Sequence, residues 1–299
     1  MLRVRTAGRL SLDERQEVLD FLSEAHAMDD SRLSDHLLLD LTQGPRAGFV
    51  GALGYHDDEL VGYAQASTGN EGYVIDGIAD ALRCADPAGI RSELLIALVA
   101  QLPPDAAITW WARPDAAAAS TAEHLRMKAD RQLLHMQRAL PITEAATVAL
   151  RSFEVGRDEQ AWLTVNNAAF AAHGEQGGWD LPALQQRVRE PWFDPDGFLL
   201  HERDERLAAF CWTKMHPGAA HDGGLAGEIY VIAVHPDFHG LGLGRALTVA
   251  GLEHMQRNGA EMAMLYVDAT NTSAVRLYES LGFTVLRTEQ SYRRPGAPQ

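Results

Sequence analysis

The feature that most constrains the fold is a set of three glycines at alternate positions between an apolar run and a helical pattern. The stretch VIAVHPDFHGLGLGRALTVAG (231–251) begins like a buried strand, turns at a proline and continues with helical spacing. A helix N-terminus presents unpaired backbone N–H groups and the positive end of the helix dipole. Glycine lets the backbone approach a phosphate group closely because it has no Cβ. The glycines alone leave two interpretations open, a phosphate-binding turn and a tight turn that binds nothing.

Two common phosphate-binding motifs do not match this stretch. A P-loop ends in Gly-Lys-Ser/Thr, but Gly244 is followed by Arg245 and Ala246. A dinucleotide fingerprint needs a third glycine where Arg245 stands. The pattern that remains is a glycine turn directly after V-H-P, at a junction between a strand and a helix.

Composition limits the class of protein. The chain has 299 residues, of which 46% are hydrophobic, which is enough for about two cored domains. No apolar run is long enough for a membrane span, and the N-terminus has no signal-peptide pattern. With only two cysteines, we expect a reducing cytoplasm. The net charge of −15 argues against nucleic acid as a partner, and the 12 histidines show no metal-site spacing, so we expect no metal.

The chain repeats itself. Three pairs of segments share a pattern, in the same order and at an offset of about 145–155 residues. The pairs are 13–24 with 158–169, 59–67 with 206–214, and 108–141 with 263–295. The repeat predicts two copies of one α+β domain, at 1–142 and 148–299, with a linker at 141–149.

The two copies are not equal. In the first copy the place of the glycine turn is taken by residues 73–100, which hold only scattered glycines. We therefore expect the second copy to carry the active feature and the first to have a degenerate loop.

Two long motifs of the second copy resemble the GNAT superfamily of acyl-CoA-dependent N-acyltransferases. IYVIAVHPDFHGLGLGRAL (229–247) is similar to its strand, pyrophosphate loop and following helix. LYVDATNTSAVRLYESLGFTV (265–285) is similar to its second signature. His239 stands where the family usually has Gln or Arg. The resemblance implies a mixed α/β fold of two tandem domains, each a bent mixed sheet flanked by helices, with a parallel pair splayed to admit the pantetheine arm.

Further segments resemble the mycothiol synthases, a family of tandem GNAT enzymes of actinobacteria. These segments are VNNAAFAAHGEQGGW (165–179), WFDPDGF (192–198), WTKMHP (212–217) and GEIYVIAVHP (227–236). The resemblance implies transfer of acetyl from acetyl-CoA to the cysteinyl amine of cysteinyl-glucosaminyl-inositol. The implied partner is therefore a small molecule, with no nucleic acid and no membrane, and we expect a monomer.

Such a transfer needs a base for the amine, donors for the carbonyl oxygen and an acid for the departing thiolate. The resemblance places the base at Glu228, before the apolar strand; a strand-end glutamate facing solvent is the alternative. It places the acid at Tyr278, which shares a helical face with Ala274, Leu277 and Leu281. A core tyrosine is the alternative interpretation there.

The remaining expected contacts fall into two sets. Acetyl-CoA is expected to bind backbone and side chains of the two signatures, namely Ile232, Ala233, Val234, His239, Gly240, Leu241, Gly242, Leu243, Gly244, Arg245, Asn271, Thr272, Ser273, Ala274, Val275 and Arg276. The acceptor is expected to bind polar side chains that suit hydroxyl groups and an ammonium, namely Asp35, Glu175, Lys214, Glu228 and Tyr266. Asp35 fits a helix N-cap equally well.

Two alternatives remain. The first is a GNAT enzyme with another acceptor, such as an aminoglycoside, a polyamine or a protein N-terminus. The second is a non-catalytic acetyl-CoA sensor, against which the presence of both Glu228 and Tyr278 speaks. No cysteine or serine stands in a nucleophile motif, so we expect direct transfer without an acyl-enzyme.

Overall fold

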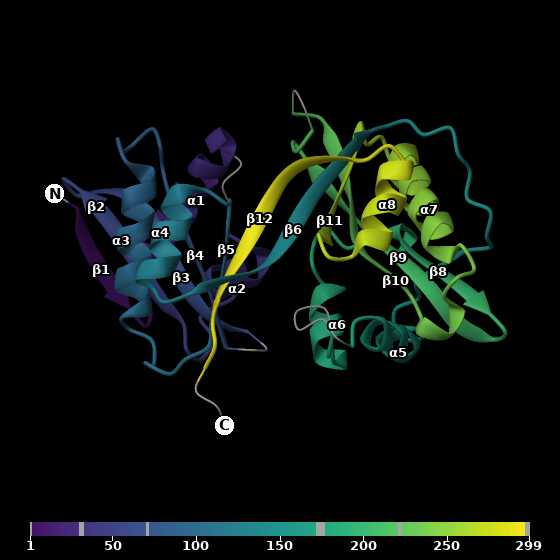
Figure 1. Cartoon of the computed structure of the whole chain (residues 1–299), viewed down its shortest axis with the longest axis horizontal. Helices are drawn as coiled ribbons and strands as arrows, with labels where there is room; N and C mark the ends of the chain where they lie inside the picture. The colour runs from purple at the N-terminus through teal and green to yellow at the C-terminus, as the bar shows by residue number, and fades with distance from the viewer. Residues whose placement is uncertain (1, 30–32, 70–71, 172–176, 221–222, 297–299) are drawn as a thin grey trace. The chain divides into compact units, whose positions relative to one another are not determined.

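The structure is a computed structural model of the 299-residue chain. It describes residues 2–29, 33–69, 72–171, 177–220 and 223–296, apart from the side chains of 26–29 and 35–36. The chain forms two compact units (Figure 1). Unit 1 comprises residues 1–132 and 288–299, and unit 2 comprises residues 133–287. No helix in the described part of the chain is long and apolar enough to cross a membrane.

Unit 1 is a mixed sheet with helices on both faces. Its elements are β1 (Arg3–Ala7), α1 (Leu12–Asp29), α2 (Asp35–Thr42), β2 (Val50–His56), β3 (Glu59–Gly69), β4 (Gly72–Ala79), α3 (Pro87–Val99), β5 (Ile108–Ala112) and α4 (Ala116–His124). Strands β6 (Lys128–Ala139) and β12 (Thr284–Arg294) contribute residues to both units. The strand order is β1-β2-β3-β4-β5-β12. Strands β4 and β5 pair in parallel, and the other pairs in this order are antiparallel.

Unit 2 has the same plan. Its elements are β7 (Arg151–Ser152), α5 (Glu159–Ala169), α6 (Leu181–Arg187), η1 (Pro195–Gly197), β8 (Phe198–Arg203), β9 (Arg206–Pro217), β10 (Leu225–Val234), η3 (Pro236–Phe238), α7 (Leu243–Arg257), β11 (Met262–Asp268) and α8 (Thr272–Ser280). The strand order is β7-β8-β9-β10-β11-β6, with β10 and β11 parallel and the other pairs antiparallel. The shared plan confirms the predicted fold class of two tandem mixed α/β copies.

Alternating apolar residues give the unit 2 sheet a core on each face. On one face, Leu247 of α7 and Tyr278 of α8 pack with strand residues such as Ile229. On the other face, Trp162 of α5 and Leu184 of α6 pack with another set of strand residues. Figure 1 shows where these two helices lie. Full burial of a leucine or isoleucine side chain stabilises the folded state by about 1.5–3 kcal/mol.

A close approach between α7 and β10 fixes the height of the helix above the sheet. A Cβ on Gly227 of β10 would collide with the side chain of Met255, in the last turn of α7. Only glycine leaves room for Met255 at this distance. The contact sets where α7 begins relative to the end of β10, and so places the glycine turn.

The compact units do not follow the predicted boundaries. Residues 288–299 pack in unit 1 because β12 pairs with β5, with Gln290 opposite Ala112 and Arg294 opposite Ile108. The second half of β6 packs in unit 2 because residues 133–139 pair with β11. Pairing partners of strands are set by tertiary packing rather than by local sequence. The assignment of functional domains to 1–142 and 148–299 stays a prediction.

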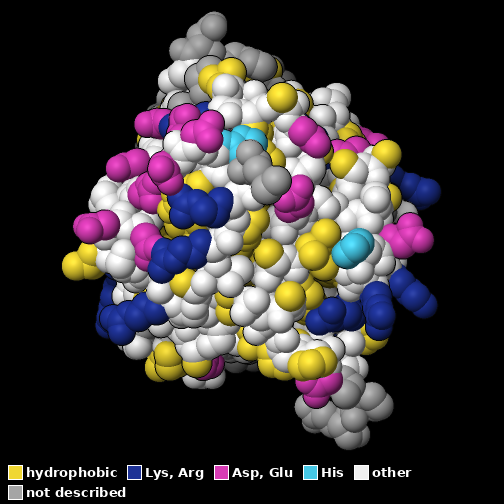
Figure 2. All heavy atoms as spheres, turned by 90° about the vertical axis from the view of Figure 1, so that its left-hand side faces the viewer, with side chains coloured by type: hydrophobic (Ala, Val, Ile, Leu, Met, Phe, Trp, Pro, Cys, Tyr) yellow, Lys and Arg dark blue, Asp and Glu magenta, His cyan; other side chains and the backbone are white. Residues whose placement is uncertain are grey.

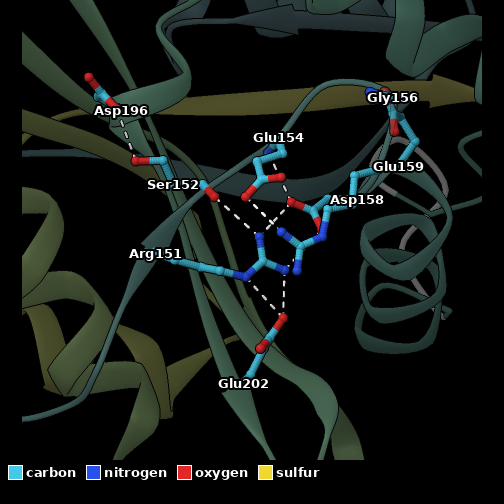
Figure 3. Close-up of polar contacts among 9 residues, drawn as sticks. Arg151, Ser152, Glu154, Gly156, Asp158, Glu159, Asp196 and Glu202 are labelled. Carbon is cyan, nitrogen blue, oxygen red and sulfur yellow. Dashed lines mark hydrogen bonds and ion pairs between the residues drawn. The ribbon is translucent and has the colours of Figure 1, made fainter.

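An ion-pair network around the buried Asp158 fixes the start of α5. Asp158 accepts hydrogen bonds from both terminal nitrogens of Arg151, at 2.5 and 2.9 Å, and from the Glu154 N–H at 2.8 Å (Figure 3). Arg151 also donates to Glu202 of β8 at 2.6 Å. Burial acts to raise the pKa of Asp158, but these hydrogen bonds outweigh it and hold the pKa below its ordinary value. The network ties α5 to β7 and β8. Helix α5 covers the sheet face on which Glu228 lies, so the network also fixes that cover.

Candidate active site

The parallel strands of unit 2 diverge beside Glu228. Their pairing runs from Ala226 opposite Met262 to Ile229 opposite Leu265, whereas β10 continues to Val234. Within the described residues, no further pair joins the two strands. A bulge follows Ile229, where pairing with β9 resumes only at Val231. The expected splay is therefore present, and alternate backbone groups of residues 230–234 face its open side.

The glycine turn follows this strand end. Pro236–Phe238 form the short helix η3, and α7 begins at Leu243. Gly242 is the N-cap of α7 and has a φ of 74°, a left-handed conformation that favours glycine. A glycine N-cap has no side chain to accept from the first N–H groups of the helix. The first N–H groups of α7 therefore have no side-chain cap from this residue.

Gly244 offers a direct test of whether this turn suits a phosphate. It lies in the first turn of α7 with ordinary helical φ, and a Cβ placed on it would have Leu277 Cδ2 as its nearest neighbour, at 3.6 Å. Nothing in the described part of the chain therefore requires glycine here. Glycine in a helix costs about 1 kcal/mol relative to alanine. The open space beside Gly244 leaves room for an anionic group to approach the backbone of the helix N-terminus.

Two side chains of the turn already have partners within unit 2. Arg245 donates to Glu144 Oε2 at 2.7 Å and to Ser280 Oγ at 2.9 Å. A ring nitrogen of His239 lies 3.0 Å from the Val234 carbonyl oxygen. His239 therefore ties the turn back to β10, and the backbone donors are the groups left for a ligand. The predicted donor contacts of Arg245 and His239 stay predictions.

Glu228 lies in the strand segment just before the splay, on the face that α5 and α6 cover. Its neighbour Ile229 packs against α7 and α8, so alternation turns Glu228 to the opposite face. Its side chain is 10% exposed, which excludes the solvent-facing alternative. Glu228 Oε2 lies 2.6 Å from His216 Nε2. A carboxylate held at a strand end beside an opening is suited to accept a proton.

Lys214 stands directly opposite Glu228 in the antiparallel pair of β9 and β10. Its ammonium nitrogen lies 4.7 Å from the ring centre of Trp192 and 5.7 Å from that of Tyr230. Tyr230 is the residue at the bulge. These rings hold the lysine cation by cation–π attraction on the face that Glu228 shares.

Tyr278 lies on the other face of the sheet. It occupies α8, is 6% exposed and packs against Phe283 with ring centres 5.8 Å apart. Burial raises the pKa of its hydroxyl well above the ordinary value, and the nearby Cys211 adds to the rise. Tyr278 is therefore protonated at neutral pH. It belongs to the core and can also be an acid, so the two interpretations are compatible.

Other predicted contacts have clear positions in unit 2. Asn271 is the N-cap of α8, and its side chain accepts from the Ala274 N–H at 3.2 Å. Tyr266 stacks on His135 with ring centres 4.6 Å apart, and Arg287 donates to its hydroxyl at 3.4 Å. Arg276 is exposed on α8. The N-cap thus explains Asn271 without a ligand, and its role toward acetyl-CoA stays a prediction.

Two predicted acceptor contacts are not placed. Glu175 lies outside the described residues. Asp35 is the first residue of α2, after the N-cap Ser34, and its side chain is not described. The N-cap alternative for Asp35 is wrong by one position.

Different residues stand at the equivalent positions of unit 1. The last two parallel pairs of unit 2 are Glu228–Met264 and Ile229–Leu265. Those of unit 1 are Val74–Thr109 and Ile75–Trp110, so Val74 takes the position of Glu228. In the nine-residue helices α4 and α8, the seventh residue is Ala122 in the first and Tyr278 in the second. The N-cap that corresponds to Gly242 is Asp86, whose carboxylate accepts from the Gly89 N–H at 2.9 Å.

An acidic hollow in unit 1 has a structural explanation. A cavity of about 500 Å³ is lined by carboxylates of α1 and the β2–β3 turn, with Arg83 among them. Arg83 pairs with Glu24, Glu59 and Asp80. Figure 2 draws one face of the molecule, and acidic side chains gather on one side of that face. The hollow is a solvated acidic surface with its own ion pairs, and we assign it no chemistry.

Sequence reasoning missed His216, Trp192 and Tyr230. His216 is two residues after Lys214 on β9, so strand alternation puts both on one face. That spacing was a usable signal for His216. Trp192 and Tyr230 come together only through the packing of separate segments.

Comparison with known proteins agrees with this geometry. Residues 162–283 match the model of the acetyltransferase (GNAT) family. Mycothiol acetyltransferase of Thermobispora bispora is 42% identical over 98% of this chain and 100% of its own length. That of Acidothermus cellulolyticus is 37% identical over 99% of this chain and 95% of its own.

Among solved structures, a GCN5-related N-acetyltransferase from Sphaerobacter thermophilus superposes with a TM-score of 0.68. The match covers 100% of this chain and 98% of that one at 20% identity, and so concerns the fold. The sequence relatives extend over the full length at well above 30% identity. The chain therefore belongs to the mycothiol acetyltransferase family within the GNAT acetyltransferases.

Proposed function

We propose that this chain transfers the acetyl group of acetyl-CoA to the cysteinyl amine of cysteinyl-glucosaminyl-inositol, giving mycothiol and CoA. The observation that carries the proposal is the position of Glu228. Its buried carboxylate lies where β10 and β11 diverge, on the strand that leads to the glycine N-cap of α7. The full-length relatives named mycothiol acetyltransferase support acetyl transfer in the formation of mycothiol, and the acceptor is the one that the family resemblance implies.

Glu228 acts as the base. An ammonium cannot attack a carbonyl until it loses a proton, and acetyl-CoA supplies an activated thioester carbonyl when bound. Glu228 takes that proton, directly or through one water, on a face where Lys214 can bind acceptor hydroxyl groups. The backbone groups of residues 232–234 that face the splay donate to the carbonyl oxygen as it gains charge.

The N-terminus of α7 binds the pyrophosphate. The N–H groups of Leu243, Gly244 and Arg245 and the helix dipole favour an anion there. Asn271 and the first turn of α8 border the same donor. We expect this binding to position the acetyl group without forming an acyl-enzyme, because Cys211 is fully buried.

Tyr278 donates a proton to the departing sulfur. We expect Tyr278→Phe to lower kcat about 10–100-fold and to leave KM for acetyl-CoA nearly unchanged, because the ring still packs while the proton donor is lost. Steady-state kinetics and thermal melting measure the two effects. A variant with full kcat would show that Tyr278 is a core residue only.

We propose that one acetyl-CoA binds per chain, in unit 2. In unit 1 the N-cap carboxylate of Asp86 already accepts from the Gly89 N–H in the first turn of α3, and its charge would repel a phosphate. Titration calorimetry should give a stoichiometry near one. Two acetyl-CoA molecules per chain in the wild type, and one in a variant substituted in unit 1, would contradict this assignment.

A panel of acceptors tests the function itself. Purified protein is incubated with acetyl-CoA and either cysteinyl-glucosaminyl-inositol, an aminoglycoside, a polyamine or a peptide N-terminus, and acetylated products are measured by mass spectrometry. We expect saturable turnover with the first acceptor alone. Turnover only with another amine would keep the Glu228 chemistry and reject the acceptor, and tight acetyl-CoA binding without any turnover would favour a sensor.

The place of action and the oligomeric state are further expectations. Both substrates are thiols or thioesters, which suits a reducing cytoplasm. We expect a monomer that binds small molecules rather than nucleic acid or membrane, with no metal. Light scattering with and without acetyl-CoA measures the oligomeric state.

A further inference from the structure

We propose that His216 is a positioning residue for the base: it holds Oε2 of Glu228 so that Oε1 is presented to the acceptor amine. The proposal rests on the proposed function for its kinetic consequences. Its geometric part stands on the contacts between the two side chains alone.

The two side chains meet through the register of β9 and β10. His216 is opposite Ala226 and Lys214 is opposite Glu228, so all three polar side chains lie on one face of the antiparallel pair. His216 Nε2 and Glu228 Oε2 are 2.6 Å apart. The side chains are 9% and 10% exposed, respectively. A contact of this length, shielded from solvent, is a strong charge-assisted hydrogen bond.

The contact decides which way the carboxylate points. A free glutamate side chain samples many rotamers, and ordering it costs free energy. Cross-strand neighbours on one face are close enough for Lys214 to attract the same carboxylate. In the structure the lysine nitrogen lies over Trp192 and Tyr230, and the carboxylate is bonded to His216. The contact with His216 thus fixes the direction of the carboxylate on the strand face that Lys214 shares.

The hydrogen bond also gives the two carboxylate oxygens of Glu228 different roles. The imidazole N–H donates to Oε2, which leaves Oε1 as the proton acceptor. A base must lie within about 2.6–3.2 Å of the atom whose proton it removes, and misplacement by about 1 Å can cost about 100-fold in rate. Loss of His216 should therefore lower kcat while leaving the acetyl-CoA site intact.

Unit 2 supplies a matched control. His254 on α7 is also buried beside a carboxylate, with Nε2 3.3 Å from Asp194 Oδ2. Burial lowers the pKa of His254, although the Asp194 carboxylate acts to raise it. Replacing His254 removes a buried histidine of unit 2 without touching Glu228.

The test compares His216→Leu, His216→Gln and His254→Leu. We expect His216→Leu to lower kcat about 10–100-fold with KM for acetyl-CoA within about threefold. Glutamine can donate from its amide to Oε2, so His216→Gln should recover most of kcat. His254→Leu should lower the melting temperature and leave kcat near that of the wild type. Full kcat in His216→Leu, or no recovery by glutamine in a variant that folds, would overturn the proposal.

A double-mutant cycle separates positioning from general damage. In a Glu228→Gln background, His216→Leu should cause no further loss of kcat, because there is no base left to position. An equal loss in both backgrounds would mean that His216 supports the fold only.

A readout without turnover separates this proposal from the proposed function. If the wild type acetylates no amine, the proposed function fails, but the proton bound to His216 Nε2 can still be followed by NMR. We expect a strongly downfield signal in the wild type that moves upfield in Glu228→Gln and stays in place in His254→Leu. A signal unchanged by Glu228→Gln would overturn the geometric part.

Discussion

Replacing Glu228 by glutamine is expected to lower kcat about 10²–10⁴-fold, equivalent to roughly 3–5 kcal/mol of transition-state stabilisation. Glutamine has nearly the same shape and can still accept from His216, so the pair should stay packed, but it cannot take a proton from the acceptor ammonium. KM for acetyl-CoA should change by less than about threefold, because the proposed donor site is the α7 N-terminus. Steady-state kinetics at saturating acceptor measure both quantities.

The pH dependence gives this prediction a second test. As pH rises, more of the acceptor is already neutral and needs no base, so the deficit of Glu228→Gln should shrink. The control is Glu253→Gln, which changes a partly exposed carboxylate on α7. A Glu228→Gln variant with more than a tenth of wild-type kcat at neutral pH would remove Glu228 from the role of base.

Replacing Gly244 by leucine is expected to raise KM for acetyl-CoA more than about 30-fold without loss of folding. The backbone at Gly244 is helical, and the space for a Cβ is open on the protein side, with Leu277 Cδ2 at 3.6 Å. Leucine is a better helix former than glycine by up to about 1 kcal/mol, so the melting temperature should hold or rise. The added side chain fills the open space where the pyrophosphate must approach the backbone.

The same substitution elsewhere on the helix provides the comparison. Glu253→Leu introduces the same side chain in the third turn of α7, away from the glycine turn, and should leave KM unchanged. Equilibrium binding of acetyl-CoA measured by calorimetry should follow KM. Wild-type acetyl-CoA affinity in a folded Gly244→Leu variant would show that this turn does not hold the donor.

Much of the fold could be predicted from the sequence because its signals are local or repeated. The apolar run before His235 and the helical spacing after Gly242 predict a strand-turn-helix unit, and the duplication gives the second copy. The pairing of β12 with β5 could not be predicted, because Gln290 and Ala112 lie far apart in sequence and no local pattern specifies such a partner. The pairing of a strand from the end of the chain with a strand of unit 1 is set by tertiary packing.

The site was predicted from motifs, and its roles stay predictions. Glu228, Tyr278 and the glycine turn all stand in such motifs, whose spacing is a local signal. His216 was missed because its partner depends on the register of β9 and β10, and a slip of one residue would turn it to the other face. The cation–π setting of Lys214 was missed because Trp192 reaches it from a separate segment.

The most direct test of the central claim is net thiol release from acetyl-CoA with cysteinyl-glucosaminyl-inositol as acceptor. Transfer to the amine frees one CoA thiol and leaves the cysteinyl thiol intact, so thiols should rise by one for each acetyl group transferred. Transfer to the cysteinyl sulfur would consume one thiol for each one freed and give no net rise. We expect a rise of one per turnover that depends on Glu228; consumption of acetyl-CoA without a rise, or no consumption at all, would contradict acetyl transfer to this amine.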